Sequence, residues 1–241
     1  MKADFGADDY ATAAHLIFER MAEKGHGFAG DMISTYVLFL HLIDTSIKQR
    51  NASIARKLAA ADDFIRNVLV NAQPPLHVLV RYFYTRVFDD LLKVQPAKAE
   101  FSRRGLRGAV YDLNLAALHQ QFFGASTPPQ ADTSVICTAD APLARYAGRF
   151  LVRTLAVVEN TYSMLLEWDD VAIKRDIGEE LWKDASEAAG NRDVTKMQEA
   201  GVSGEIVAAM RELEDSLNIT PEDRLVPLGQ EGRIAWVVTL N

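Results

Sequence analysis

One segment near the start of the chain limits the fold more than any other. Between Ile33 and Ile47, apolar residues recur every three or four positions, which is the spacing of one face of a helix. Leu38, Phe39 and Leu42 fill most of the remaining sides, so this helix is apolar nearly all round. Such a helix has to be covered by other elements. The segment therefore predicts a central helix in a multi-helix bundle.

Helical spacing also runs through most of the chain before residue 169. We expect further helices at about 8–24, 51–72, 76–94, 97–123 and 140–168, with the central helix capped by Asp31. Turns rich in Gly or Pro separate them. The exception is a short β-prone run that ends just before Asp140, and we expect Asp140 to cap the helix that follows.

The pattern changes after Trp168. We expect an acidic helix, a short helix ending in the turn Glu199–Ser203, a longer helix and a two-stranded hairpin, at about 170–188, 193–200, 204–217 and 225–240. This order of elements resembles the winged-helix family. The predicted fold is therefore mainly α, with a helical bundle domain over 1–168 and a small acidic winged-helix-like (helix-helix-hairpin) module over 169–241.

Composition and the first residues bear on the compartment. The chain has 241 residues, of which 49% are apolar, enough for a sizeable core. Its single cysteine, Cys137, excludes a disulfide within the chain and fits a reducing compartment. The stretch Met1–Asp9 is acidic and lacks the basic start and apolar centre of a signal peptide. No apolar run approaches the roughly 20 residues of a membrane span. We therefore expect a cytoplasmic protein without a membrane partner.

Charge is divided between two blocks. Residues 48–108 carry 12 Lys or Arg against 5 Asp or Glu, whereas residues 167–224 carry 7 against 16. Such asymmetry points to partners rather than to a fold. The basic block suits nucleic acid or an acidic protein, and it equally suits the chain's own acidic block or that of a second copy in a homo-oligomer. The candidate phosphate contacts are Arg81, Arg86, Arg103, Arg104 and Arg107.

The helix expected at 204–217 points to a protein partner. In winged-helix DNA binders the second helix of the pair enters the major groove with the help of basic residues. Here that helix is acidic, and phosphate would repel it. We therefore expect it to dock a protein. The candidate partner-binding residues are Glu205, Arg211, Glu212 and Trp236.

Four aspartates support an enzymatic alternative. His41-Leu-Ile-Asp44-Thr-Ser, the acids around Asp90, Tyr111-Asp112 and Val-Ile-Cys-Thr-Ala-Asp140 resemble, in this order, the acidic motifs of PIN-domain nucleases. The resemblance implies that Asp44, Asp90, Asp112 and Asp140 hold Mg²⁺ or Mn²⁺ and activate water against a phosphodiester. The competing interpretation makes Asp140 a helix cap and the other three surface positions. Helical spacing over 33–47 and 76–91 favours this second interpretation.

No other catalytic, metal or cofactor motif occurs. The five histidines form neither His-x-x-x-His nor Glu-x-x-His, and no phosphate-binding glycine loop is present. The favoured prediction is a non-catalytic interaction or assembly subunit without a metal or cofactor. It would dock a protein partner through the C-terminal module and contact nucleic acid or an acidic protein through 48–108. The nuclease is the alternative.

Overall fold

The computed structural model is mainly helical. It describes residues 25–69, 75–87, 106, 109–110, 112–114, 141–158, 161–190, 204–219, 226–228 and 233–235. Its helices are α2 (Gly25–Lys48), α3 (Ile54–Asn67), α4 (Pro75–Thr85), α7 (Ala141–Ala147), α8 (Asp170–Ile177), α9 (Glu179–Gly190) and α11 (Gly204–Ser216). Its strands are β1 (Phe150–Val158), β2 (Thr161–Trp168), β3 (Val226–Leu228) and β4 (Arg233–Ala235). No helix within these ranges combines the length and the apolarity that crossing a membrane requires.

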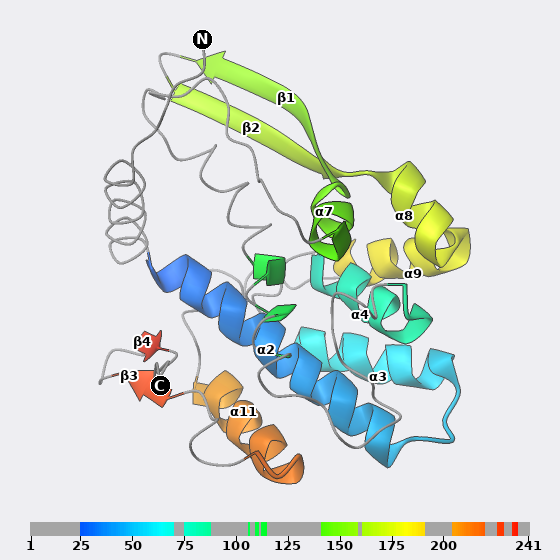
Figure 1. Ribbon diagram of the computed structural model, residues 1–241, viewed down its shortest axis with the longest axis vertical. Helices are drawn as coiled ribbons and strands as arrows, with labels where there is room; N and C mark the ends of the chain where they lie inside the picture. The colour runs from blue at the N-terminus through cyan, green and yellow to red at the C-terminus, as the bar shows by residue number, and fades with distance from the viewer. Residues whose placement is uncertain are drawn as a thin grey trace.

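The central helix that the sequence predicts is α2. It lies between α3 and α4 on one side and α11 on the other (Figure 1). Its residues Val37 to Leu40 are 0% exposed, so no side of the helix faces water there. The helix begins at Gly25, which places Asp31 inside it and not at its cap. The prediction of a central bundle helix is confirmed, and the predicted cap is wrong.

The next two helices are shorter than predicted. α3 begins at Ile54 rather than at about residue 51, and it is capped by Ser53, whose Oγ accepts a hydrogen bond from Arg56 N at 3.3 Å. α4 ends at Thr85, because Arg86 takes a left-handed backbone conformation with φ of 64°. The two helices pack against each other and against α2. Of the helix predicted at 97–123, six residues are described, and all six are helical. The helix predicted at 8–24 lies outside the described residues.

The helix predicted over 140–168 is wrong for most of its length. α7 ends at Ala147, and the chain then forms an antiparallel hairpin in which Phe150 pairs with Trp168 and Val158 with Thr161. Residues 150–168 include three Val, two Thr and three aromatic residues, all of which favour strands. The apolar positions fit both the helical and the strand period, so the helical spacing alone does not distinguish a helix from a strand in this segment.

The acidic helix predicted at 170–188 is two helices. Gly178 separates α8 from α9 with φ of 87°, a conformation that only glycine adopts without strain. Asp169 caps α8 by accepting a hydrogen bond from Ala172 N at 3.0 Å. Both helices pack against α4. Ile173 and Ala185 lie in the hydrophobic core that also contains the apolar residues of α2.

The C-terminal elements follow the predicted order where the structure describes them. α11 covers nearly the whole range predicted for it and packs on α2 through Ile206, Met210 and Leu213. β3 and β4 pair antiparallel, Val226 with Ala235, within the predicted hairpin. The helix predicted at 193–200 lies outside the described residues. The apolar residues of α11 join the same core as those of α2, and the domain boundary after Trp168 stays a prediction.

Candidate functional site

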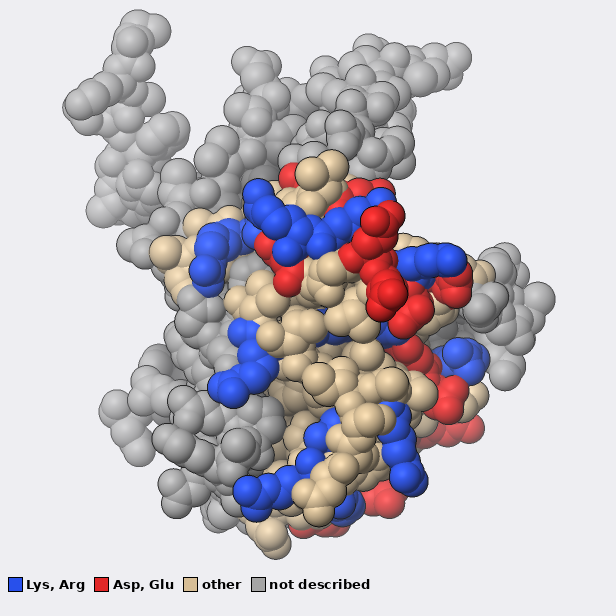
Figure 2. Space-filling view, turned by 90° about the vertical axis from the view of Figure 1, so that its right-hand side faces the viewer, with Lys and Arg blue, Asp and Glu red and all other residues tan. Residues whose placement is uncertain are grey.

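Three of the five exposed cations in the described part of the basic block lie where α2 turns into α3. Lys48, Arg50 and Arg56 are exposed, and Lys57 is half-buried. Among them Ile47 is 40% and Ile54 53% exposed, unusually high values for large apolar side chains. Figure 2 shows blue and tan side chains together in the lower part of the face that it draws. We call this surface the basic turn, and we define it by Ile47, Lys48, Arg50, Ile54, Arg56 and Lys57.

The sequence predictions did not single out the basic turn. They selected arginines by clustering along the chain, whereas exposure depends on the phase of each helix. In α3 the buried positions Leu58, Ala61 and Ile65 fix which side faces the core. Arg56 points away from that side. Combining the inward positions with the charge run would have identified this surface.

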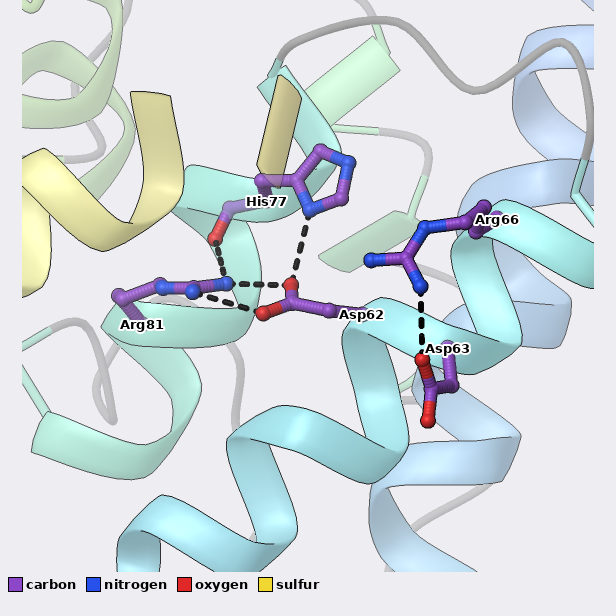
Figure 3. A network of polar contacts seen from close by, with 5 residues as sticks. All are labelled: Asp62, Asp63, Arg66, His77 and Arg81. Carbon is purple, nitrogen blue, oxygen red and sulfur yellow. Dashed lines mark hydrogen bonds and ion pairs between the residues drawn. The ribbon is translucent and has the colours of Figure 1, made fainter. Parts of the chain in front are cut away.

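Arg81, which we predicted to contact nucleic acid, is buried instead. It is 2% exposed and lies with Asp62 and His77 between α3 and α4 (Figure 3). Its Nη1 and Nη2 donate to the two carboxylate oxygens of Asp62 at 2.5 and 2.7 Å. His77 Nδ1 lies 2.8 Å from Asp62 Oδ1. The guanidinium is thus engaged inside the protein, and the prediction for Arg81 is wrong.

The charges of this cluster stabilise one another. Burial alone would raise the pKa of Asp62, but the hydrogen bonds from His77 and Arg81 and the charge of Arg81 outweigh it and lower that pKa below its usual value. Asp62 is therefore ionised, and the contact with Arg81 is a bidentate ion pair. Because its partners come from two helices, the pair fixes how α3 and α4 pack.

Of the other predicted phosphate contacts, the structure describes one, Arg86. Arg86 is exposed just after the end of α4. Arg103, Arg104 and Arg107 lie outside the described residues. Their role in binding nucleic acid stays a prediction.

α11 has two distinct sides. Ile206, Met210 and Leu213 are buried against α2. The opposite side is exposed, and its residues recur at intervals of three and four positions. We call it the acidic face, and it consists of Glu205, Ala208, Glu212 and Asp215.

Two of the four predicted partner-binding residues lie on this acidic face, namely Glu205 and Glu212. Arg211 is half-buried, and its Nη1 contacts Glu214 Oε2 at 2.6 Å. Glu214 is 0% exposed and also accepts a hydrogen bond from Tyr36 of α2 at 3.3 Å. Arg211 therefore helps to hold α11 on α2. Trp236 lies outside the described side chains.

The four aspartates of the nuclease alternative are only half described. Asp44 is 9% exposed, accepts a hydrogen bond from Ser216 Oγ at 2.6 Å and pairs with Lys48 Nζ at 3.0 Å. Asp112 is half-buried in a helical segment. Asp90 and Asp140 lie outside the described residues. Within the described ranges, no three His, Cys, Asp or Glu side chains come close enough to share a metal ion. Convergence of the four carboxylates stays a prediction.

Another polar contact ties the base of the β1–β2 hairpin to the helices. Arg149 Nε contacts Asp176 Oδ2 at 2.6 Å, and Tyr82 OH donates to the same oxygen at 3.3 Å. Burial, reinforced by the charge of Asp176, raises the pKa of Tyr82, so this tyrosine stays a neutral donor. The backbone of Asp169 closes the hairpin by donating to Arg149 O at 2.8 Å. This contact positions α4, α8 and the hairpin relative to one another.

Comparison with known proteins identifies no relative. No family model matches the chain, and neither a curated protein nor a solved structure matches it. The positions of the charged and apolar side chains are therefore the basis for a functional proposal.

Proposed function

We propose that this protein is a non-catalytic interaction or assembly subunit that docks a protein partner through the acidic face of α11. The observation that carries the proposal is the division of α11 into two sides. One side is anchored on α2 by Ile206, Met210 and Leu213, and the other presents Glu205 and Glu212 to solvent. A helix held in this way is a rigid platform, which lowers the entropic cost of binding.

The partner is a protein surface rather than nucleic acid. Carboxylates at 205, 212 and 215 would repel a phosphate backbone, whereas they complement lysines and arginines on a protein. In the proposed winged-helix-like arrangement, α11 is the contact helix and the β3–β4 hairpin lies in the position of the wing. The basic block at 48–108 provides a second surface, for nucleic acid or an acidic protein.

Site-specific photocrosslinking tests the proposal. A photoreactive phenylalanine analogue replaces Ala208, in the middle of the acidic face, and the matched control replaces Ser186, which is exposed on α9. In cells that express the chain naturally, we expect a protein adduct at position 208 and none at 186. The Glu205→Lys/Glu212→Lys variant should abolish the adduct, whereas Glu180→Lys/Glu187→Lys on α9 should leave it intact.

The adduct also has to correspond to a direct interaction. Once mass spectrometry identifies the crosslinked protein, the two purified proteins should bind each other, and the α11 variant should weaken this binding by about tenfold or more. Equal adducts at 208 and 186, or an adduct that nuclease removes, would contradict a protein-docking role.

A further inference from the structure

The acidic face and the basic turn are neighbours on one molecule. α11 lies alongside α2 (Figure 1). The Oγ of its last residue, Ser216, donates a hydrogen bond to Asp44 Oδ1 at 2.6 Å. Asp44 in turn pairs with Lys48, which belongs to the basic turn. A surface of negative charge therefore adjoins one of positive charge at the C-terminal end of α2.

Two adjacent surfaces of opposite charge form a self-complementary patch. A two-fold symmetric dimer requires such a patch, because each surface of one subunit meets the other surface of its twin. A two-fold axis relates the two copies by a rotation of about 180°. The acidic face of the second copy then meets the basic turn of the first, and the acidic face of the first meets the basic turn of the second. One pairing of surfaces thus produces two equivalent contacts.

The basic turn also has apolar content that such an interface needs. Stable interfaces combine an apolar centre with a polar rim. Ile47 and Ile54 are two of the three large apolar side chains that are exposed in the described part of the chain, the third being Val171 on α8. Across the proposed contact, Ala208 lies between the carboxylates of the acidic face, where a small residue leaves room for an isoleucine.

Other occupants fit this pair of surfaces less well. A nucleic acid bound at the basic turn would bring its phosphates beside Glu212 and Asp215 of the neighbouring helix, which repel them. Phosphate also gains nothing from exposed isoleucines. The acidic residues of α9 lie on a helix that packs on α4 and α8. They lack the link through Asp44 and Lys48 that joins the acidic face of α11 to the basic turn, so they form no comparable self-complementary patch.

We infer that the partner of the acidic face is the basic turn of a second copy of this chain, in a two-fold symmetric dimer. The inference rests on the proposed docking role of α11 and names its partner. Glu205 and Glu212 of one subunit lie opposite Arg50 and Arg56 of the other. Ile47 and Ile54 fill the centre of the contact.

Charge exchange tests the dimer with the purified full chain. Sedimentation equilibrium should show a dimer that dissociates as salt is raised, because salt screens exposed charges. The Arg50→Glu/Arg56→Glu variant and the Glu205→Lys/Glu212→Lys variant should each be monomeric, with the dissociation constant raised about a hundredfold or more. The control, Glu180→Lys/Glu187→Lys on α9, changes the charge equally and should leave the dimer intact.

Mixing the two monomeric variants gives the decisive result. In a two-fold dimer, both contacts of the mixed pair join opposite charges again, so we expect a heterodimer with nearly the affinity of the wild type. All the substituted residues are exposed, and circular dichroism should show that each variant keeps its helix content. A monomeric wild-type chain, or variants that do not associate on mixing, would overturn the inference.

The experiments distinguish a wrong dimer proposal from a wrong docking role for α11. If position 208 crosslinks to another protein while the chain stays monomeric, the second copy is refuted and the docking role stands. If position 208 gives no protein adduct and the chain is monomeric, both are refuted. A dimer that the α9 control variant disrupts, and the α11 variant does not, would also overturn the inference.

Discussion

The buried cluster between α3 and α4 and the basic turn use the same kinds of residue in opposite ways. Both lie in the basic block, and α3 contributes to each. Asp62 of α3 is 8% exposed and binds the buried Arg81, whereas Arg56, less than two turns earlier, is exposed. The difference shows that net charge along a segment does not say which cations can reach a partner. The position of each cation around its helix, relative to the buried side, decides this.

The same contrast decides what each charge contributes. A buried ion is stable only when its partner is present, because it has lost its hydration. An exposed ion keeps its water, so its pairing adds little to stability and the charge remains available to a partner. Substitutions in the cluster should therefore affect folding, and substitutions in the basic turn should affect association.

The largest effect is expected from Arg81→Met. The variant keeps most of the side-chain volume but leaves the carboxylate of Asp62 without its bidentate partner, so the free energy of unfolding should fall by about 3–5 kcal/mol. The matched control is Arg66→Met, which removes the exposed pair with Asp63 at 2.9 Å (Figure 3) and should cost about 1 kcal/mol or less. Urea denaturation measures both. Similar losses in the two variants would remove the distinction between the cluster and the surface.

The outcome for Arg81 also shows why the sequence failed there. Every residue from Leu76 to Phe83 is buried, so α4 has no exposed side over this stretch. The local sequence is apolar except for His77 and Arg81, and an arginine in such a setting has to be paired internally. The sequence therefore indicates that Arg81 is paired inside the protein. It does not identify the partner, because Asp62 lies 19 residues earlier in the chain.

Helices were predictable where one period was dominant. α2 and α11 were predicted because their apolar residues follow the helical spacing over many residues. The β1–β2 hairpin was missed because Leu151, Leu155 and Val158 fit that spacing too, and the break at Gly178 because one glycine does not always end a helix. For the candidate site, Glu205 and Glu212 were predicted from charge alone. The basic turn could have been predicted by combining the inward positions of α3 with the run of basic residues.

Asp44 lies between the two regions of the comparison, and its substitution should have an intermediate effect. It is buried beneath the basic turn and joins α2 to α11 through Ser216. Hydrogen bonds to charged groups contribute about 1.5–3 kcal/mol, so Asp44→Ala should reduce the free energy of unfolding by about that amount. Ser216→Ala should cost less, and the double variant should reveal a coupling of about 0.5 kcal/mol or more.

The same cycle bears on the nuclease alternative. A carboxylate whose role is to hold a metal ion would show no coupling to Ser216, and its removal would raise stability or leave it unchanged. Additive effects of Asp44→Ala and Ser216→Ala would therefore count against the structural role assigned to Asp44.

The smallest effect is a dependence of stability on pH that involves His41. This residue stacks on Phe64 with ring centroids 4.0 Å apart, and burial lowers its pKa more strongly than the charge of Asp44 raises it. The unfolded chain therefore binds a proton at His41 more readily than the folded chain does. Its contribution is fully present above the unfolded pKa of about 6.5 and is lost as the pH falls below that value.

Urea midpoints measured from about pH 7.5 to pH 5 should reveal this loss, in a range well above the pKa of Asp62. His41→Gln removes the titrating group and should flatten the dependence, although it also lowers stability at neutral pH by removing the stacking on Phe64. His77→Gln is the contrasting variant. It leaves His41 and its stacking on Phe64 in place, so the part of the slope that is due to His41 should remain. If stability changes equally with pH in the wild type and in His41→Gln, burial of His41 does not govern this dependence. A charge at this half-buried position would then contribute as little to stability as the exposed charges of the basic turn.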